Sequence, residues 1–77
     1  MHVYFKREKM IGDDILTDHF IVNTEKVCLV RQIEGMTAPS GHIKYKDGCT
    51  LYISGLDVGI DVDGTIDEVM SALKSKL

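Results

Sequence analysis

The 77-residue sequence contains no apolar run that approaches the ~20 residues of a membrane span. We expect no secretory leader, because the apolar residues of the first segment precede its charges and the segment is far too short. It has no basic excess, since 9 lysines and arginines stand against 12 aspartates and glutamates. A nucleic-acid-binding face is usually clearly basic, and this balance disfavours one. We therefore expect a cytoplasmic protein with no membrane contact.

Cysteine and histidine are too few and too scattered to predict a metal centre. The two cysteines, Cys28 and Cys49, form no Cys-x-x-Cys pair and have no metal-ligand spacing. Both lie in apolar strand-like segments, which predicts free, buried thiols. A disulfide would instead require their Cβ atoms to lie about 3.8 Å apart. The histidines His2, His19 and His42 are each expected to be solvated, and we assign no catalytic residue, cofactor or metal ligand.

The length of the chain favours functions that use a surface. A chain of 77 residues is expected to form one domain, residues 1–77. Its 44% apolar content is enough for a core. A chain this short buries only about 60% of its unfolded surface, which leaves little room for a deep, enclosed active-site cleft.

Short strands separated by polar connections are expected in the first half of the chain. The expected strands are residues 2–6, 20–22 and 27–33. Residues 7–18 are charged and broken by Gly12-Asp13-Asp14, which predicts a loop or a wide hairpin connection. Both faces of 27–33 are partly apolar, and we therefore expect this strand to be central in its sheet.

Residues 43–53 predict a β-hairpin around Asp47-Gly48. A two-residue turn would place lysines on the apolar face of the second strand. A three-residue loop, residues 46–48, pairs Tyr45 with Cys49 instead and gathers the apolar side chains on one face. Because a one-residue slip moves every side chain to the other face, the second register is preferred. It requires Gly48 in a left-handed conformation at a G1 bulge.

The end of the chain predicts a capped helix. Residues 56–63 alternate apolar and mostly acidic residues, which predicts either a strand or an extended connector. Thr65 is a candidate N-cap, and Glu68 completes a capping box. An apolar stripe then follows helical spacing at Ile66, Val69, Met70, Leu73 and Leu77. A helix this short is marginal alone and is expected to dock on the sheet.

The segment Asp61-Val62-Asp63-Gly64-Thr65 resembles the first motif of haloacid-dehalogenase-like phosphatases. In that family the first aspartate is the nucleophile and the second an acid/base, with Mg²⁺ nearby. The family's later motifs are missing here, because only 12 residues follow Thr65. An acidic strand and a helix cap use the same residue types. A phosphatase remnant is therefore the least favoured function, and weak cation binding by Asp57, Asp61 and Asp63 stays open.

Three further segments resemble small flagellar and swarming-motility accessory proteins. They are Phe20-Ile21-Val22-Asn23-Thr24-Glu25-Lys26-Val27, Tyr45-Lys46-Asp47-Gly48 and Ile66-Asp67-Glu68-Val69. The pattern of strand, hairpin and terminal helix is shared, and small phage or mobile-element proteins have a similar pattern. The resemblance implies a small, non-enzymatic accessory or interaction module.

These patterns predict an α+β fold, a small antiparallel β-meander of five to six strands with one C-terminal helix packed on one face. The other face stays uncovered, with Val30 and Tyr52 as candidate interface anchors. We expect a protein–protein interaction module that self-associates, as a dimer. The alternative is a small nucleic-acid-binding regulator. A structure that places Tyr52 on one face with four basic residues would favour that alternative. The four residues are Lys6, Arg7, Lys44 and Lys46.

Overall fold

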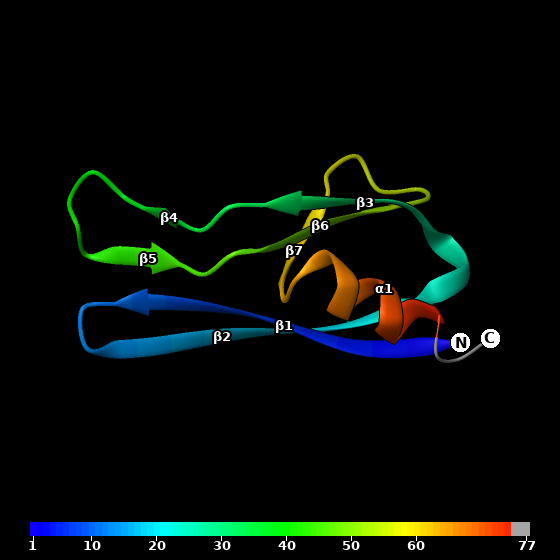
Figure 1. Ribbon diagram of the computed structural model, residues 1–77, viewed down its shortest axis with the longest axis horizontal. Coiled ribbons are helices and arrows are strands. Elements are labelled where there is room, and N and C mark those ends of the chain that lie inside the picture. The colour runs from blue at the N-terminus through cyan, green and yellow to red at the C-terminus, as the bar shows by residue number, and fades with distance from the viewer. Residues whose placement is uncertain (75–77) are drawn as a thin grey trace.

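The computed structural model describes residues 1–74 (Figure 1). These residues form seven strands in two antiparallel sheets and one C-terminal helix. The elements are β1 (His2–Ile11), β2 (Asp14–Asn23), the 3₁₀ turn η1 (Thr24–Lys26), β3 (Val27–Ile33), β4 (Met36–Thr37), β5 (Ile43–Tyr45), β6 (Gly48–Ile53), β7 (Ile60–Asp63) and α1 (Ile66–Lys74). The four-stranded sheet has the order β2-β1-β5-β4, and the three-stranded sheet has the order β3-β6-β7. The predicted α+β class and terminal helix are confirmed, and the strands number seven, in two sheets.

The β1–β2 hairpin is the longest feature of the fold. Its two ten-residue strands pair without a break from His2–Asn23 to Ile11–Asp14. Gly12 has a φ of 59°, as the first position of a two-residue type II′ turn requires. Of the two alternatives for residues 7–18, the loop was therefore wrong, and the hairpin connection is present but closes in a tight two-residue turn. Only the first half of the hairpin faces the core, and the second half carries no apolar alternation by which it could be recognised as a strand.

The hairpin predicted for residues 43–53 does not form. β5 pairs with β1 and β4, whereas β6 pairs with β3 and β7, and the chain passes from one sheet to the other between Tyr45 and Gly48. Gly48 does not have a positive φ, so its predicted left-handed bulge was wrong. A Cβ atom at Gly48 would collide with the Val62 carbonyl and approach the Arg7 guanidinium. Glycine is needed at position 48 because β6 approaches the backbone of β7 closely there.

β3 has the predicted bounds but lies at the edge of its sheet, so the expectation of a central strand was wrong. A bulge between Val27 and Leu29 shifts the alternation of side chains. As a result, Val27 and Val30 pack against the core, while Leu29 is 57% exposed. Both cysteines are free; Cys49 is buried as expected, but Cys28, at this bulge, is exposed.

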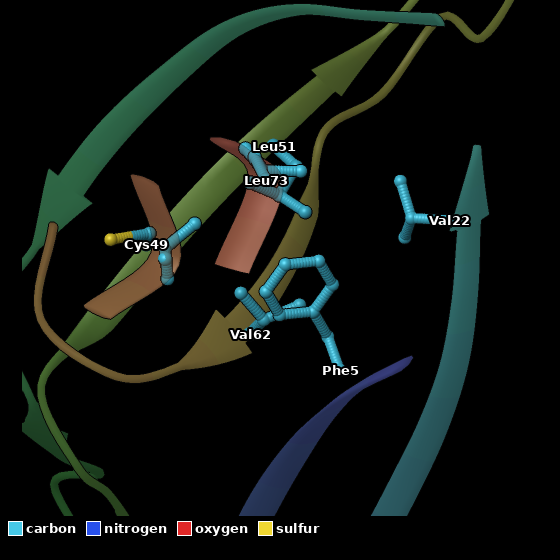
Figure 2. Close-up of a cluster of buried hydrophobic side chains, with 7 residues drawn as sticks. Phe5, Val22, Cys49, Leu51, Val62 and Leu73 are labelled. Atoms are coloured by element: carbon cyan, nitrogen blue, oxygen red, sulfur yellow. The ribbon is translucent and has the colours of Figure 1, made fainter. Parts of the chain in front are cut away.

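The hydrophobic core lies where both sheets meet α1 (Figure 2). Its buried side chains are Phe5, Val22, Cys49, Leu51, Val62, Val69 and Leu73. Burial of one such aliphatic or aromatic side chain contributes roughly 1.5–3 kcal/mol. All of these residues come from one end of the molecule, and the other end has no core of its own.

The capping box of α1 is confirmed. The Glu68 amide donates to Thr65 Oγ1 at 3.1 Å, and the Thr65 amide donates to Glu68 Oε1 at 3.3 Å. The described part of the predicted apolar stripe faces the sheets, with Val69 and Leu73 buried. Leu77, its last predicted member, lies outside the described residues. β7 begins at Ile60, so residues 60–63 of the predicted 56–63 segment form a paired strand and residues 56–59 form a bent, irregular connection.

Candidate interaction surface

The part of the four-stranded sheet farthest from α1 is a single layer that we call the arm, residues 8–17 and 36–45 (Figure 1). No residue in these two ranges is buried. The helix packs on β3 and β6, at the other end of the molecule. The radius of gyration is 13.1 Å, compared with about 11.5 Å expected for a compact domain of this length. The arm accounts for this elongation, and both of its faces meet solvent.

The strand register assigns the side chains of the arm to two faces. Directly paired residues of antiparallel strands lie on the same face. The inner face, which continues the face of Phe5 and Arg7, carries the row Leu16, Lys9, Tyr45 and Met36. The outer face carries the row Ile15, Met10, Lys44 and Thr37. Large apolar side chains are therefore exposed on both faces.

The outer face continues toward the core with an aromatic pair. The Tyr4 hydroxyl lies 2.7 Å from His19 Nδ1, and the two rings stack with their centroids 5.8 Å apart. Ile21, which pairs with Tyr4, is 68% exposed. Exposed Ile15 and Ile21 thus lie on this face of β2, with the polar Thr17 and His19 between them.

β2 has a free backbone edge along its ten residues. β2 is the outermost strand of its sheet, and within residues 1–74 it pairs only with β1. It contains no proline, lysine or bulge, three of the features that protect edge strands from pairing, and its charged residues are Asp14 and Asp18. Such an edge is a template for another strand.

The two-residue turn determines which β2 groups face this edge. It makes Ile11 and Asp14 a hydrogen-bonded pair, and such pairs recur at every second residue. The N–H and C=O groups of the odd-numbered residues, from Ile15 to Asn23, therefore point away from β1. The same phase directs the Glu8 amide of β1 away from β2, where it donates to Asp63.

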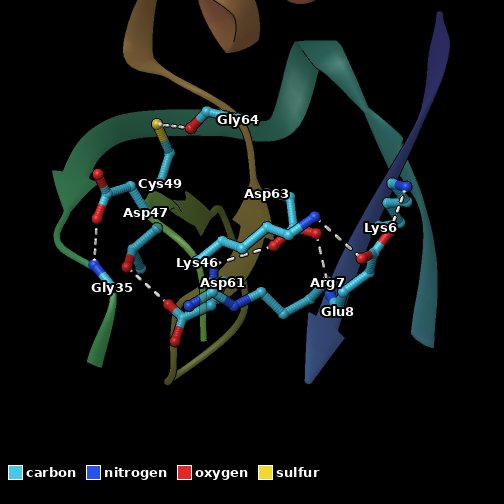
Figure 3. A network of polar contacts seen from close by, with 11 residues as sticks. Lys6, Arg7, Glu8, Gly35, Lys46, Asp47, Cys49, Asp61, Asp63 and Gly64 are labelled. Carbon is cyan, nitrogen blue, oxygen red and sulfur yellow. Dashed lines mark hydrogen bonds and ion pairs between the residues drawn. The ribbon is translucent and has the colours of Figure 1, made fainter. Parts of the chain in front are cut away.

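Asp63 joins the two sheets (Figure 3). Arg7 Nη1 donates to Asp63 Oδ1 at 3.1 Å, and the Glu8 amide donates to Asp63 Oδ2 at 3.0 Å. The Arg7 guanidinium also lies 5.0 Å from the centre of the Tyr45 ring. Asp61 accepts a hydrogen bond from Thr50 Oγ1 at 2.7 Å. Both aspartates of the phosphatase-like segment thus make contacts within the fold.

Val30 and Tyr52, the anchors expected from the sequence, lie on opposite faces of the three-stranded sheet. Val30 pairs with Leu51 and packs against the core, whereas Tyr52 pairs with the exposed Leu29. The structure therefore does not bring the two residues together on one surface.

The turn signal Gly12-Asp13 was present in the sequence and could have identified the β1–β2 hairpin, and with it the open edge.

Of the basic residues considered for nucleic-acid binding, Lys6 and Lys44 lie in the four-stranded sheet, whereas Tyr52 lies on β6 of the other sheet. Arg7 is buried against Asp63, and Lys6 and Lys46 both contact Glu8. The hydrogen bonds from Lys6 and then Lys46 hold the pKa of the Glu8 carboxyl below its usual value. A groove of about 600 Å³ beside Arg7 has three acidic residues in its lining, Asp18, Glu34 and Asp61. This acidic lining is unfavourable for phosphate groups.

No protein-family model, curated protein or solved structure matches this chain. In the part of the chain that the structure describes, no helix has the length and apolar character needed to cross a membrane. Residues 1–74 likewise contain no group of three or more His, Cys, Asp or Glu side chains that could hold a metal ion. The candidate site is therefore defined by the open edge and exposed faces of the arm.

Proposed function

We propose that this chain is a non-enzymatic accessory protein that acts as a protein–protein interaction module and self-associates through the free edge of β2. The open β2 edge on a single-layer sheet carries this proposal. A sheet needs a packed hydrophobic face or a covering element for stability, and the arm has neither within residues 1–74. A second copy would supply the missing contacts. A two-fold dimer is the commonest solution for identical chains.

The accessible surface of the single chain exceeds that of a compact monomer by about the area that one partner buries in a standard interface. The accessible surface is 5420 Å². A compact monomer of this mass exposes about 4,700 Å². The excess is close to the roughly 800 Å² that each partner buries in a standard interface. A dimer would thus bring the exposed area of each chain near that of a compact domain.

The small size of the chain and its resemblance to motility accessory proteins both agree with this role. Small domains often supplement an insufficient core by association. The accessory role that the resemblance to flagellar and swarming-motility proteins implied is of the same kind. The proposal retains the cytoplasmic location expected from the sequence, and the two free cysteines are consistent with a reducing compartment.

Sedimentation equilibrium across the micromolar range tests self-association. We expect the wild-type mass to approach two chains as concentration rises. Ile21→Lys places a charge on the β2 edge and should shift the protein to monomer, since lysine protects edge strands. Val58→Lys is the matched control, because Val58 is similarly exposed, at 73%, and lies outside β2. A wild-type protein that stays monomeric, or equal weakening by both variants, would contradict the proposal.

A further inference from the structure

We infer that two copies pair directly through β2, antiparallel about a two-fold axis at His19, so that their four-stranded sheets join into one continuous sheet. This inference rests on the proposed function and specifies its contact. The edge amides and carbonyls of β2 would then bond to those of the second copy. The sheet order across the contact would be β4-β5-β1-β2 followed by β2-β1-β5-β4 of the second copy.

The symmetry restricts the possible registers. A strand pairs antiparallel with its own copy only about an axis perpendicular to the sheet. Such an axis keeps the two inner faces on the same side, so odd-numbered residues oppose odd-numbered residues. The odd-numbered residues of β2 are also the ones whose backbone groups face the open edge. The registers that keep the two inner faces on the same side therefore also bring the unpaired backbone groups of the two β2 strands opposite each other.

Charge selects one register among those that remain. Axes at Asp18 or at His19 give the longest overlaps of the ten-residue strand. An axis at Asp18 would set its carboxylate opposite its own copy, at a non-hydrogen-bonded position where Cα atoms are about 4.5 Å apart. Like charges directly opposite are destabilising. An axis at His19 sets Asp18 opposite Phe20 instead, which separates the two carboxylates.

This register also covers exposed apolar side chains. Ile21 lies opposite Thr17 of the second copy and diagonal to its Ile15, and diagonal neighbours on a sheet are within reach of each other. Ile21 and Ile15 are 68% and 58% exposed in the single chain. On the inner face, exposed Leu16 lies opposite Val22 of the second copy. Val22 is already buried at 4% exposure in the single chain, so the exposed isoleucines of the outer face gain most of the new apolar contact.

Cysteine cross-linking tests the register, in a Cys28→Ser background that removes the exposed native thiol. Opposed residues of a hydrogen-bonded pair have Cα atoms about 5.5 Å apart, within the range that a disulfide bridges. His19→Cys should therefore form disulfide-linked dimers on mild oxidation. Thr17→Cys and Ile21→Cys should each form few alone, because each is displaced from its own copy by roughly 13 Å along the strand. A mixture of the two should cross-link.

Val58→Cys is the collisional control, and its cross-linking should be much slower than that of His19→Cys. Equal rates would overturn the inference. A wild-type protein that sediments as a monomer would contradict the proposed function itself. A wild-type dimer in which neither His19→Cys nor the mixture cross-links would overturn the β2 register while leaving self-association intact.

Discussion

Arg7 and Asp63 form an ion pair across the junction of the two sheets, with 8% and 13% of their side chains exposed. The second Asp63 oxygen accepts a hydrogen bond from the Glu8 amide. These contacts attach β1 to β7 and therefore attach the arm to the core. Removing one partner of a buried pair leaves an uncompensated charge, which makes this pair sensitive to substitution.

Asp63→Asn should lower the free energy of unfolding by about 3 kcal/mol, because the Arg7 guanidinium loses its counter-charge. Asp61→Asn is the matched control on the same strand. It alters one hydrogen bond at an exposed residue and should cost about 1 kcal/mol. Urea unfolding of both variants measures the difference. Equal losses would show that the Asp63 contacts do not hold the sheets together.

Gly48→Ala should destabilise the fold by about 2–3 kcal/mol, because its methyl group would collide with the backbone of β7. Gly41→Ala is the matched control. Gly41 has a φ of 76° and open space around it, so alanine there should cost about 1 kcal/mol through backbone strain alone. Thermal unfolding compares the two. A larger loss for Gly41→Ala would contradict the close-approach explanation.

Thr65→Ala should cost about 1 kcal/mol, since the Glu68 amide loses its acceptor at the start of α1. Thr65→Ser keeps the hydroxyl and should retain most of the wild-type stability. Urea unfolding monitored by circular dichroism distinguishes them. If serine proves as damaging as alanine, the hydroxyl does not cap the helix.

Local signals in the sequence predicted the elements that depend on neighbouring residues. The α1 cap follows from Thr65 and Glu68, which are three residues apart and satisfy each other's amides. The bounds of β3 follow from its apolar composition. Its edge position did not follow, because the bulge beside Cys28 lets one apolar side chain face the core and the next face solvent.

The arm could not be predicted from hydrophobic periodicity. Both of its faces meet solvent, so charged side chains such as Lys9 and Glu8 occur on both, and no alternation results. The Asp47-Gly48 pair was interpreted as a hairpin turn because that dipeptide is a strong turn signal. In the structure it lies where the chain changes sheets, and Asp47 Oδ1 accepts a hydrogen bond from the Gly35 amide. Such a crossing depends on contacts between distant segments.

Amide hydrogen exchange of β2 tests self-association through this strand most directly. The Thr17 and Ile21 amides face the open edge, whereas those of Asp18 and Phe20 face β1 and serve as internal controls. We predict that the two edge amides are unprotected in dilute protein and become protected as concentration rises, while the control amides are protected throughout. Edge amides that exchange at unstructured-peptide rates at every concentration, with protected controls, would contradict the account.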